Sequence, residues 1–454
     1  MAEPYEPLYG AAEMRVAEER YPNYPDSVPE LMERAGTAVA REAMLAYPAA
    51  RSFACVCGAG SNGGDGRIAA RVLREAGHVA DETSEVDGYD VVVDALFGTG
   101  FHGEPRAEAA ELIARMNAAA APVVAVDVPS GVDASTGEIA GKAVEADLTV
   151  TFHAPKAGLV LAPGRFRAGR VVVADIGLEG GSTELRRATP ALLDEIPLRW
   201  AGDTKYAASV LVVGGEPGLT SAACLTAMAA LRADAGYVAL AVPHASLGTA
   251  ETLALEPVKI PWGDDDAADV LLSAAQRAKA LALGPGLGRG PERKALVREL
   301  LARIDLPTVV DADALFELEP VERAAATVLT PHAGELGRLL GRDTEWVDAH
   351  RLAAAREAAE RFGAIVLLKG TDTIVASPDG SVAVSDHGPP SLATAGTGDV
   401  LTGVIAAFLA KGVEPATAAT AAAVAHGLAG RVAPRQAGLL ASDLLGLLPH
   451  VLDR

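Results

Sequence analysis

Short apolar runs alternate along the chain with longer segments of helical periodicity. The run SFACVC at residues 52–57 leads into a glycine-rich loop, GAGSNGGDG, which is followed by the helical pattern of RIAARVLREAG. Further apolar runs occur at 90–97, 122–128, 148–153 and 170–178. Such runs, separated by helical or turn-rich segments, are typical of buried parallel strands. The first part of the chain is therefore predicted to form an α/β domain, preceded by a helical cap at 11–20 and 29–47.

The alternation restarts after a stretch without any sustained period. Residues 179–203 mix glycine, proline and charged residues, which places the predicted boundary near Pro197 and gives domains of 1–197 and 198–454. Beyond it, strands are expected at 209–215, 236–243, 280–288, 307–315, 327–335 and 364–370, with a hairpin at 373–385. Helices are expected at 220–235, at 345–362 and from the AGTGDVLTG segment to the C-terminus. A second α/β domain is implied.

Length and charge narrow the possible functions. The chain has 454 residues, of which 39 are Lys or Arg and 60 are Asp or Glu, so its formal net charge is −21. This length suits two to three domains, and a surface this acidic repels nucleic acid and anionic membranes. Three cysteines (Cys55, Cys57 and Cys224) do not make a disulfide framework, and the acidic N-terminus lacks the pattern of a secretory leader. We therefore expect a cytoplasmic protein.

Polar residues gather at the ends of the predicted strands of the first domain. The glycine-rich loop joins a strand to a helix, where backbone N–H groups can hold an anion, and it carries Asn62 and Asp65. Asp94 and Asp127 each end an apolar run, and parallel sheets bind ligands at the carboxyl ends of their strands. Oxygen donors from Asn62, Asp94 and Ser130 suit a hard cation rather than zinc. Alternatively, the loop is only a tight turn and the aspartates only form turns or caps.

The second domain contains a different glycine-rich segment, AGTGDVLTG. Gly396, Thr397 and Gly398 put backbone donors at a helix start, and Asp399 follows them. Such a nest can hold a transferring phosphoryl group while an aspartate accepts the proton of an attacking hydroxyl. A second polar cluster, TPHAGE, contains His332. The alternatives are a simple helix cap, in which Asp399 only favours the helix dipole, and a structural, hydrogen-bonded histidine.

Three phrases of the first domain, CGAGSNGGDGRIAARVL, VVVDALFGTGFHG and VAVDVPSGVDASTG, resemble the NAD(P)H-hydrate epimerase family over roughly residues 10–195. The resemblance implies a Rossmann-like, three-layer domain, with Asp127 as the acid/base or orienting carboxylate and Asn62, Asp94 and Ser130 as K⁺ ligands. It also implies substrate contacts from Ser61, Asn62, Gly63, Gly64, Asp65, Gly98, Thr99, Gly100, Phe101, His102, Gly103, Glu104 and Asp127. The family usually has Asn at the position of Ser61, and Arg or Lys at that of His102.

Six phrases of the second domain, VVGG, GPGLG, DADAL, TPHAGE, LLKGTDTIV and AGTGDVLTG, stand in the order typical of the ADP-dependent NAD(P)H-hydrate dehydratase family, which this domain resembles. The resemblance implies a ribokinase-like α/β fold. It implies that Asp399 is the catalytic base and that Gly286, His332 and Asp399 contact the hydrate. Nucleotide contacts are implied for Lys369, Gly370, Thr371, Asp372, Thr373, Gly396, Thr397 and Gly398. One departure lies in DTKYAASVLVVGG, where Tyr206 to Ser209 replace a more glycine-rich segment.

Together the resemblances imply a bifunctional enzyme that repairs the hydrated nucleotides NADHX and NADPHX. The first domain would interconvert the two C6 epimers. The second would phosphorylate the C6 hydroxyl of the S epimer with ADP, so that the ring nitrogen expels phosphate and AMP is left. Mg²⁺ is expected with the nucleotide, K⁺ in the first domain, and a homo-oligomer as the assembly.

Two rival functions stay open. One is a ribokinase-fold kinase that acts on a pyrimidine or sugar alcohol, although TPHAGE replaces the Asn-x-x-Glu seen in sugar kinases of that fold. The other keeps the dehydratase but makes the first domain an inactive scaffold, or a domain that binds RNA or protein. The net charge of −21 argues against RNA.

Overall fold

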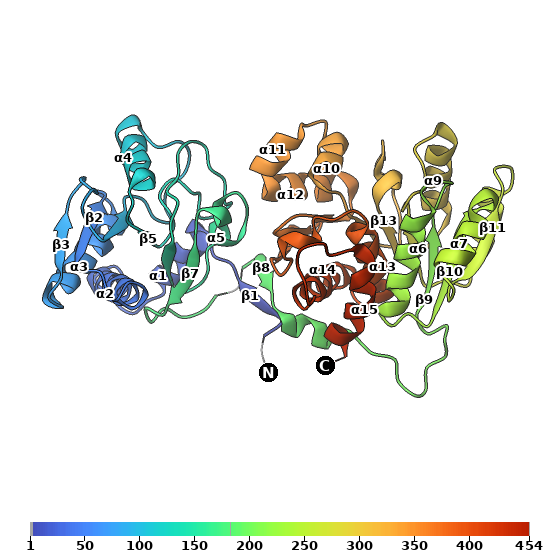
Figure 1. Ribbon diagram of the computed structural model, residues 1–454, viewed down its shortest axis with the longest axis horizontal. Helices are drawn as coiled ribbons and strands as arrows, with labels where there is room; N and C mark the ends of the chain where they lie inside the picture. The colour runs from blue at the N-terminus through green and yellow to red at the C-terminus, as the bar shows by residue number, and fades with distance from the viewer. Residues whose placement is uncertain (1–2, 182, 454) are drawn as a thin grey trace. The chain divides into compact units, whose positions relative to one another are not determined.

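The computed structural model describes residues 3–181 and 183–453, and the chain divides into two units (Figure 1). The N-terminal unit comprises chiefly residues 7–185. The C-terminal unit comprises the segment that ends at Glu6 and most of the chain from Arg186 onward. Each unit is built on its own sheet. The α/β class that the two sets of apolar runs predict is confirmed.

The N-terminal unit contains a six-stranded parallel sheet of order β3-β2-β4-β5-β6-β7. Its strands are β2 (Ser52–Cys57), β3 (Val79–Glu82), β4 (Val91–Ala95), β5 (Val123–Val126), β6 (Leu148–Phe152) and β7 (Arg170–Ala174). Its helices are α1 (Ala11–Glu19), α2 (Val28–Ala46), α3 (Ser61–Glu75), α4 (Ala107–Ala118) and α5 (Ala157–Val160). The chain reverses direction across the sheet between β2 and β4, so the carboxyl ends of these strands border the crevice in which such sheets bind ligands.

Alternate side chains of the central strands point to opposite faces of this sheet. Phe53 and Val93 belong to the apolar cluster that includes residues of α2 and α3. Val56 and Val92 belong instead to a cluster with Ile113 of α4. Helices α2 and α3 therefore cover one face and α4 covers the other, which gives the three layers predicted for a Rossmann-like domain.

The C-terminal unit contains an eleven-stranded sheet of order β1-β8-β17-β16-β15-β14-β13-β12-β9-β10-β11. Its strands are β1 (Tyr5–Pro7), β8 (Leu185–Ala188), β9 (Ser209–Val213), β10 (Tyr237–Pro243), β11 (Val258–Trp262), β12 (Ala280–Leu283), β13 (Thr308–Val310), β14 (Thr327–Leu329), β15 (Ile365–Leu368), β16 (Thr373–Ala376) and β17 (Val382–Ser385). Strands β9 to β15 are parallel, whereas β15, β16 and β17 pair antiparallel, as the expected hairpin requires. Here the chain reverses direction between β9 and β12.

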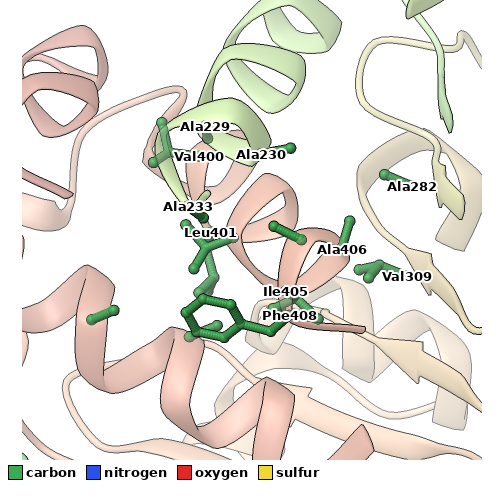
Figure 2. Packing of buried hydrophobic residues seen from close by; sticks show 14 of the residues in the cluster. Ala229, Ala230, Ala233, Ala282, Val309, Val400, Leu401, Ile405, Ala406 and Phe408 are labelled. Carbon is green, nitrogen blue, oxygen red and sulfur yellow. The ribbon is translucent and has the colours of Figure 1, made fainter. Parts of the chain in front are cut away.

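Helix α13 forms the centre of the apolar core of the C-terminal unit. Figure 2 shows its Leu401 near Ala233 at the end of α6, and Phe408 of α13 belongs to the same apolar cluster. A Cβ on Gly403 of α13 would lie only 2.2 Å from the carbonyl oxygen of Thr226, so the close approach of these two helices requires glycine there. The helices are α6 (Thr220–Arg232), α7 (Leu247–Leu253), α8 (Ala267–Ala275), α9 (Pro291–Arg303), α10 (Ala333–Leu340), α11 (Thr344–Ala349), α12 (Arg351–Phe362), α13 (Thr397–Ala410), α14 (Pro415–Arg431) and α15 (Ala441–Leu452).

The edge of the larger sheet differs from the expectation drawn from periodicity. Strands β1 and β8 extend it beyond β17, and Arg187 of β8 forms ion pairs with Glu6 at 3.3 Å and with Asp386 at 2.9 Å. The boundary between the two units consequently falls at Arg186. The sequence places it further along the chain, near Pro197. The segment 345–362, expected to be one helix, forms α11 and α12. Within the described residues, no helix combines the length and apolar character needed to cross a bilayer.

Candidate active sites

A cavity of about 700 Å³ opens at the crevice beside β2 and β4, and we call it the α3 cavity. The predicted substrate contacts that line it are Ser61, Asn62, Asp65, Gly98, Thr99, Gly100, Phe101 and Asp127. Phe97 also borders it and stacks on Phe101 with ring centroids 4.6 Å apart. The cavity therefore brings two predicted loops and the end of β5 together beside an aromatic pair.

The remaining predicted contacts of this domain do not line the α3 cavity: Gly63, Gly64, His102, Gly103 and Glu104. Two of the glycines have a packing role. A Cβ on Gly63 would lie 1.9 Å from the carbonyl oxygen of Gly58, and one on Gly64 would lie 2.0 Å from Cε of Met32. No side chain caps α3, so the N–H groups of its first turn stay available to an anion, as the loop pattern predicts.

Asp127 is held rigidly at the end of β5, where its φ of 68° is uncommon for a residue other than glycine. Its Oδ1 accepts a hydrogen bond from the Thr151 hydroxyl at 3.0 Å and pairs with Lys156 Nζ at 3.1 Å. Its Oδ2 accepts from the backbone N–H of Thr99 at 3.1 Å and from the Thr99 hydroxyl. Burial by itself raises the pKa of Asp127, but Lys156 and these hydrogen bonds outweigh burial and hold the pKa below its ordinary value.

Lys156 is a component of this site that the sequence reasoning missed. The side chain is fully buried, and its Nζ donates to the Thr151 hydroxyl and the Phe152 carbonyl, each at 2.8 Å, and to the Ala154 carbonyl at 3.2 Å. Lysine is almost never fully buried unless it is paired. The available signal was a lysine within the otherwise apolar stretch HAPKAGLVLA.

Asp94, Ser130 and Asn62 meet around the turn that follows β4. The fully buried Asp94 accepts hydrogen bonds from the Ser130 hydroxyl at 2.6 Å and from the Ser130 N–H at 2.8 Å. The Ser130 hydroxyl also lies 3.3 Å from the carbonyl oxygen of Phe97. Asn62 Oδ1 is 2.9 Å from the place that a Cβ on Gly98 would occupy. Burial raises the pKa of Asp94 to about 6 against the opposing effect of its hydrogen bonds.

Two further carboxyl groups, Asp65 and Glu18, face the α3 cavity. Asp65 on α3 is 8% exposed, and its Oδ1 has no hydrogen-bond partner in the described part of the chain. Burial raises the pKa of Asp65 to about 8, and the nearby charges of Asp127 and Glu18 act in the same direction. The pKa of the half-buried Glu18 is raised by burial and by Asp127, while Lys156 opposes the rise. This cavity thus combines an ionised carboxylate with carboxyl groups that retain a proton more readily.

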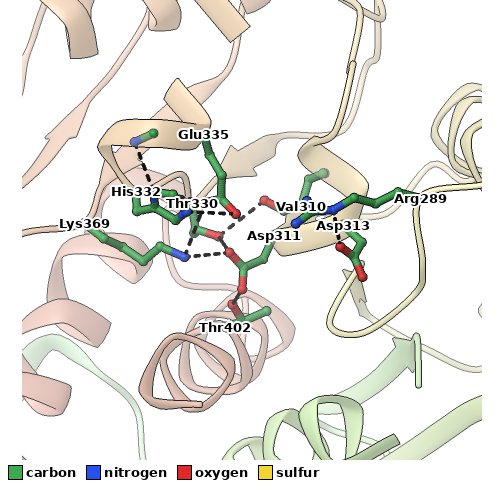
Figure 3. A network of polar contacts seen from close by, with 10 residues as sticks. Arg289, Val310, Asp311, Asp313, Thr330, His332, Glu335, Lys369 and Thr402 are labelled. Carbon is green, nitrogen blue, oxygen red and sulfur yellow. Dashed lines mark hydrogen bonds and ion pairs between the residues drawn. The ribbon is translucent and has the colours of Figure 1, made fainter. Parts of the chain in front are cut away.

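In the C-terminal unit, polar residues converge where β13, β14 and β15 end (Figure 3). Asp311, which is 1% exposed, accepts at Oδ1 from the Thr330 hydroxyl at 2.8 Å and from Lys369 Nζ at 2.9 Å. Its Oδ2 accepts from the Thr402 hydroxyl at 2.8 Å. Burial lowers the pKa of Lys369, but Asp311 and Glu335 raise it by more, so Lys369 stays cationic. The sequence reasoning did not single out Asp311, although the phrase DADAL begins with it.

Asp399 stands in the first turn of α13 beside this network. The N-cap residue Gly396 has φ 91°, and no side chain caps the helix, so first-turn N–H groups stay available to an anion. The pKa of Asp399 is raised to about 7, chiefly by burial and also by the charges of Asp311 and Asp313, while Lys369 opposes the rise. A carboxyl group with this pKa suits a general base at neutral pH.

A second cavity of about 600 Å³, which we call the α13 cavity, is bordered by Thr397 and Gly398 of the first turn of α13, whereas Asp399 and Gly396 do not line it. The predicted nucleotide contacts that line it are Lys369, Gly370, Thr371, Thr373, Thr397 and Gly398, and His332 borders it as well. A Cβ on Gly398 would lie 3.4 Å from Lys369 Nζ. The two predicted nucleotide segments, which are far apart in the sequence, therefore meet at one end of this cavity.

Three predicted residues have structural partners of their own. Asp372 is fully buried and forms an ion pair with Arg351 at 3.1 Å. Gly286 has φ 62°, and a Cβ there would lie 2.4 Å from the carbonyl oxygen of Leu219, so the turn after β12 requires glycine. His332 is the N-cap of α10, and its Nδ1 accepts from a backbone N–H at 3.0 Å, which matches the structural alternative for this histidine.

His426 on α14 borders the α13 cavity and was also missed. It is 8% exposed, and its Nε2 has no partner among the described residues. Burial lowers the pKa of His426 to about 4, against the opposing effect of a hydrogen bond to the backbone of Thr397. The imidazole is therefore neutral near pH 7.

Comparison with known families covers both units. Residues 210–450 match the family model described as NAD(P)H-hydrate dehydratase, and residues 28–83 and 78–158 match the one described as YjeF-related protein N-terminus. The chain is 39% identical to a bifunctional NAD(P)H-hydrate repair enzyme of Moorella thermoacetica, over 93% of this chain and 92% of that one. It is 38% identical to a relative of the same description from Pyrobaculum aerophilum, over 93% and 94%.

Solved structures resemble the C-terminal unit. An ADP/ATP-dependent NAD(P)H-hydrate dehydratase from Bacillus subtilis, co-crystallised with ATP and Mg²⁺, aligns with a TM-score of 0.54 and 28% identity, over 59% of this chain and 97% of that one. A ribokinase-like superfamily protein from Enterococcus faecalis aligns with a TM-score of 0.54 and 23% identity, over 61% and 98%, which bears on the fold alone. The ribokinase-like fold predicted for the second domain is confirmed.

Proposed function

This chain belongs to the family of bifunctional NAD(P)H-hydrate repair enzymes, and on that premise we propose how its two units divide the reaction. The C-terminal unit dehydrates the S epimer of the hydrate to NAD(P)H at the expense of ADP. The N-terminal unit interconverts the R and S epimers, so that the whole pool of hydrate reaches the dehydratase.

The observation that carries the dehydratase proposal is that Lys369 and Gly398 meet at the α13 cavity and that Asp399 follows Gly398 in the first turn of α13. Lys369 brings a cation to within 3.4 Å of the Cβ position of Gly398, at the uncapped start of α13. A cation and free N–H groups are the donors that stabilise a transferring phosphoryl group. Asp399, the next residue, has its pKa raised to about 7 chiefly by burial, which allows it to accept a proton at neutral pH.

In the proposed reaction, Asp399 accepts the proton of the C6 hydroxyl while the hydroxyl oxygen attacks the β-phosphorus of ADP. AMP leaves, and the C6 oxygen carries the phosphoryl group. The lone pair of the ring nitrogen then expels phosphate, and loss of the C5 proton restores the ring double bond of NAD(P)H. Lys369 and the first-turn N–H groups of α13 hold the phosphoryl oxygens during the transfer.

Mg²⁺ is proposed to accompany the nucleotide. This ion takes phosphate oxygens, waters and one or two carboxylates, and it would neutralise phosphate charge. Because Asp399, the acidic residue in the first turn of α13, is the base in this proposal, phosphate oxygens and waters would hold the ion.

For the N-terminal unit we propose Asp127 as the catalytic carboxylate and K⁺ as the bound ion. The donor set around the turn after β4 suits K⁺, because it consists of oxygens only: the carboxylate of Asp94, the hydroxyl of Ser130, the amide oxygen of Asn62 and the carbonyl of Phe97. The ion would supply the positive charge that a fully buried Asp94 otherwise lacks.

A product analysis tests the proposal. Purified protein is incubated with the S epimer of hydrated NADH and ADP, and NADH, AMP and phosphate are quantified. The expected result is one AMP and one phosphate per NADH formed. A stable phosphorylated organic product without free phosphate would support the kinase alternative, and turnover with ATP only would overturn ADP as the donor. The three free cysteines suit the reducing cytoplasm in which we place the enzyme.

A further inference from the structure

The α3 cavity holds more acid/base groups than a single catalytic aspartate requires. Asp127 projects from the end of β5, Asp65 from α3 and Glu18 from α1, and all three line the same cavity. Their hydrogen bonding differs. Both oxygens of Asp127 are held by protein donors, whereas Oδ1 of Asp65 is buried without a partner among the described residues.

An unpartnered oxygen is costly for a buried carboxylate but suits a protonated carboxyl group that donates to a ligand. Asp65 is 8% exposed and lies in α3 just beyond its first turn, close to the other cavity-lining residues of that helix, Ser61 and Asn62. Lys156 pairs with Asp127 and with no other carboxylate of this cavity. The same cavity therefore contains one carboxylate built to stay ionised and one carboxyl group built to keep its proton.

We propose that Asp65 is a second catalytic residue of epimerisation, the proton donor that works opposite the base Asp127. The inference rests on the epimerase function proposed for this unit. Lys156 is a positioning residue, because its ion pair with Asp127 and its hydrogen bond to the Thr151 hydroxyl hold that carboxylate in place.

The step balances as a substitution of one water for another. Asp65 gives its proton to the C6 hydroxyl, the C6–O bond breaks, and water leaves while the lone pair of the ring nitrogen forms a C6–N double bond. A second water attacks C6 from the opposite face and gives its proton to Asp127. The hydroxyl is now on the other face, and exchange with solvent returns the proton from Asp127 to the bulk and restores it to Asp65. An acid and a base on two faces are the arrangement of enzymes that invert a carbon centre with water.

The expected pH dependence follows from the groups that face Asp65. These are Asp127, Glu18 and, through Asp127, Lys156; Arg15 of α1 borders the cavity as well. Burial and the charges of Asp127 and Glu18 raise the pKa of Asp65 to about 8, so its acid form is lost as pH rises through that value. Epimerisation should therefore slow above about pH 8.

The test uses the full-length protein and the separated epimers of hydrated NADH in water enriched in ¹⁸O. Wild-type protein should place one solvent oxygen on C6 per inversion, beyond the rate of a protein-free sample. Asp65→Asn should lower the rate by ~10²–10⁴ and leave ADP-dependent dehydration unchanged. In Asp65→Glu the epimerisation rate should still fall at alkaline pH (the alkaline limb of the pH–rate profile), but the midpoint of that fall should be shifted. The matched control is Glu19→Gln, an exposed carboxylate one residue beyond Glu18, which should behave as wild type.

Three results would overturn the inference: an Asp65→Asn rate within a few-fold of wild type, inversion without solvent oxygen, or an alkaline limb that disappears in Glu18→Gln but persists in Asp65→Asn. If Asp65→Asn melts early, Asp65→Glu carries the test, and an unshifted limb in that variant refutes the role. Wild-type protein that dehydrates the S epimer but never interconverts epimers would instead refute the epimerase function of this unit, and the inference with it.

Discussion

Dehydration should depend on pH through Asp399, and the size of the effect follows from its surroundings. Burial and the charges of Asp311 and Asp313 raise the pKa of Asp399 to about 7, against the effect of Lys369. A base must be ionised to accept a proton. With a pKa of about 7, roughly a tenth of Asp399 is ionised at pH 6 and roughly nine tenths at pH 8, so kcat/KM for the S epimer should rise about tenfold over that interval.

The variant Asp399→Asn removes the base and should lower dehydration by ~10²–10⁴ at every pH. Epimer interconversion by the same preparation should be unchanged, because that chemistry lies in the other unit. The assay follows NADH formation from the S epimer and ADP, with epimer exchange followed by chromatography. Asp265→Asn is the matched control, because Asp265 is exposed in the turn before α8.

A second variant tests whether the pH dependence belongs to Asp399 itself. Asp313→Asn removes one of the charges that raise the pKa of Asp399, so the midpoint of the rate profile should move to lower pH. Asp313 itself pairs with Arg289 at 2.6 Å (Figure 3). A midpoint that stays in place in Asp313→Asn, together with an Asp399→Asn variant close to wild type, would refute the assignment of the base.

Three further predictions concern other parts of the molecule. Asp94→Asn should slow epimer interconversion and remove its dependence on K⁺; equally fast wild-type exchange in choline buffer would contradict the ion site. His426→Ala should raise KM for ADP more than it lowers kcat, because a neutral imidazole that borders the α13 cavity is lost; an unaltered KM would count against that role. Arg351→Met should lower the free energy of unfolding by roughly 3–5 kcal/mol, because the buried Asp372 loses its ion pair with Arg351; urea unfolding with a loss under about 1 kcal/mol would contradict it.

Much of the fold could be predicted because most strands are continuous apolar runs in the sequence. Strands β2, β4, β9 and β15 are buried along most of their length and lie within the expected ranges. Strands β1 and β8 escaped prediction because YEP and LRRA carry no such pattern, and they are stabilised by contacts with residues far along the chain, as in the pairing of Arg187 with Asp386. The periodicity of apolar residues indicates which local segments are buried, but it does not identify partners that are distant in the sequence.

The residues of the candidate sites likewise divide into those that the sequence could predict and those that it could not. Asp94, Asp127 and Asp399 could be predicted because each lies at a strand or helix end, where a parallel sheet places its ligand groups. Lys156 had only one signal, its place in an apolar stretch, and its pairing with Asp127 could not be predicted. His426 could not be predicted, because its burial and its unpartnered Nε2 are not recorded in a single sequence. The family likeness of the chain, by contrast, follows from whole phrases in order and is confirmed by relatives that span both units.

The two units share one electrostatic arrangement although their sheets and reactions differ. In each, a buried aspartate after a central strand pairs with a lysine: Asp127 with Lys156 at 3.1 Å, and Asp311 with Lys369 at 2.9 Å. In each, burial and the charge of that aspartate raise the pKa of a neighbouring carboxyl group, to about 8 for Asp65 and to about 7 for Asp399. In each unit the charge of the lysine-paired aspartate acts together with burial to move the pKa of the second carboxyl group toward neutrality, where one proton can be given or taken. Removing either lysine should therefore disturb both carboxyl groups of its pair, so each lysine is required for the acid/base chemistry even though it need not touch the reacting atoms.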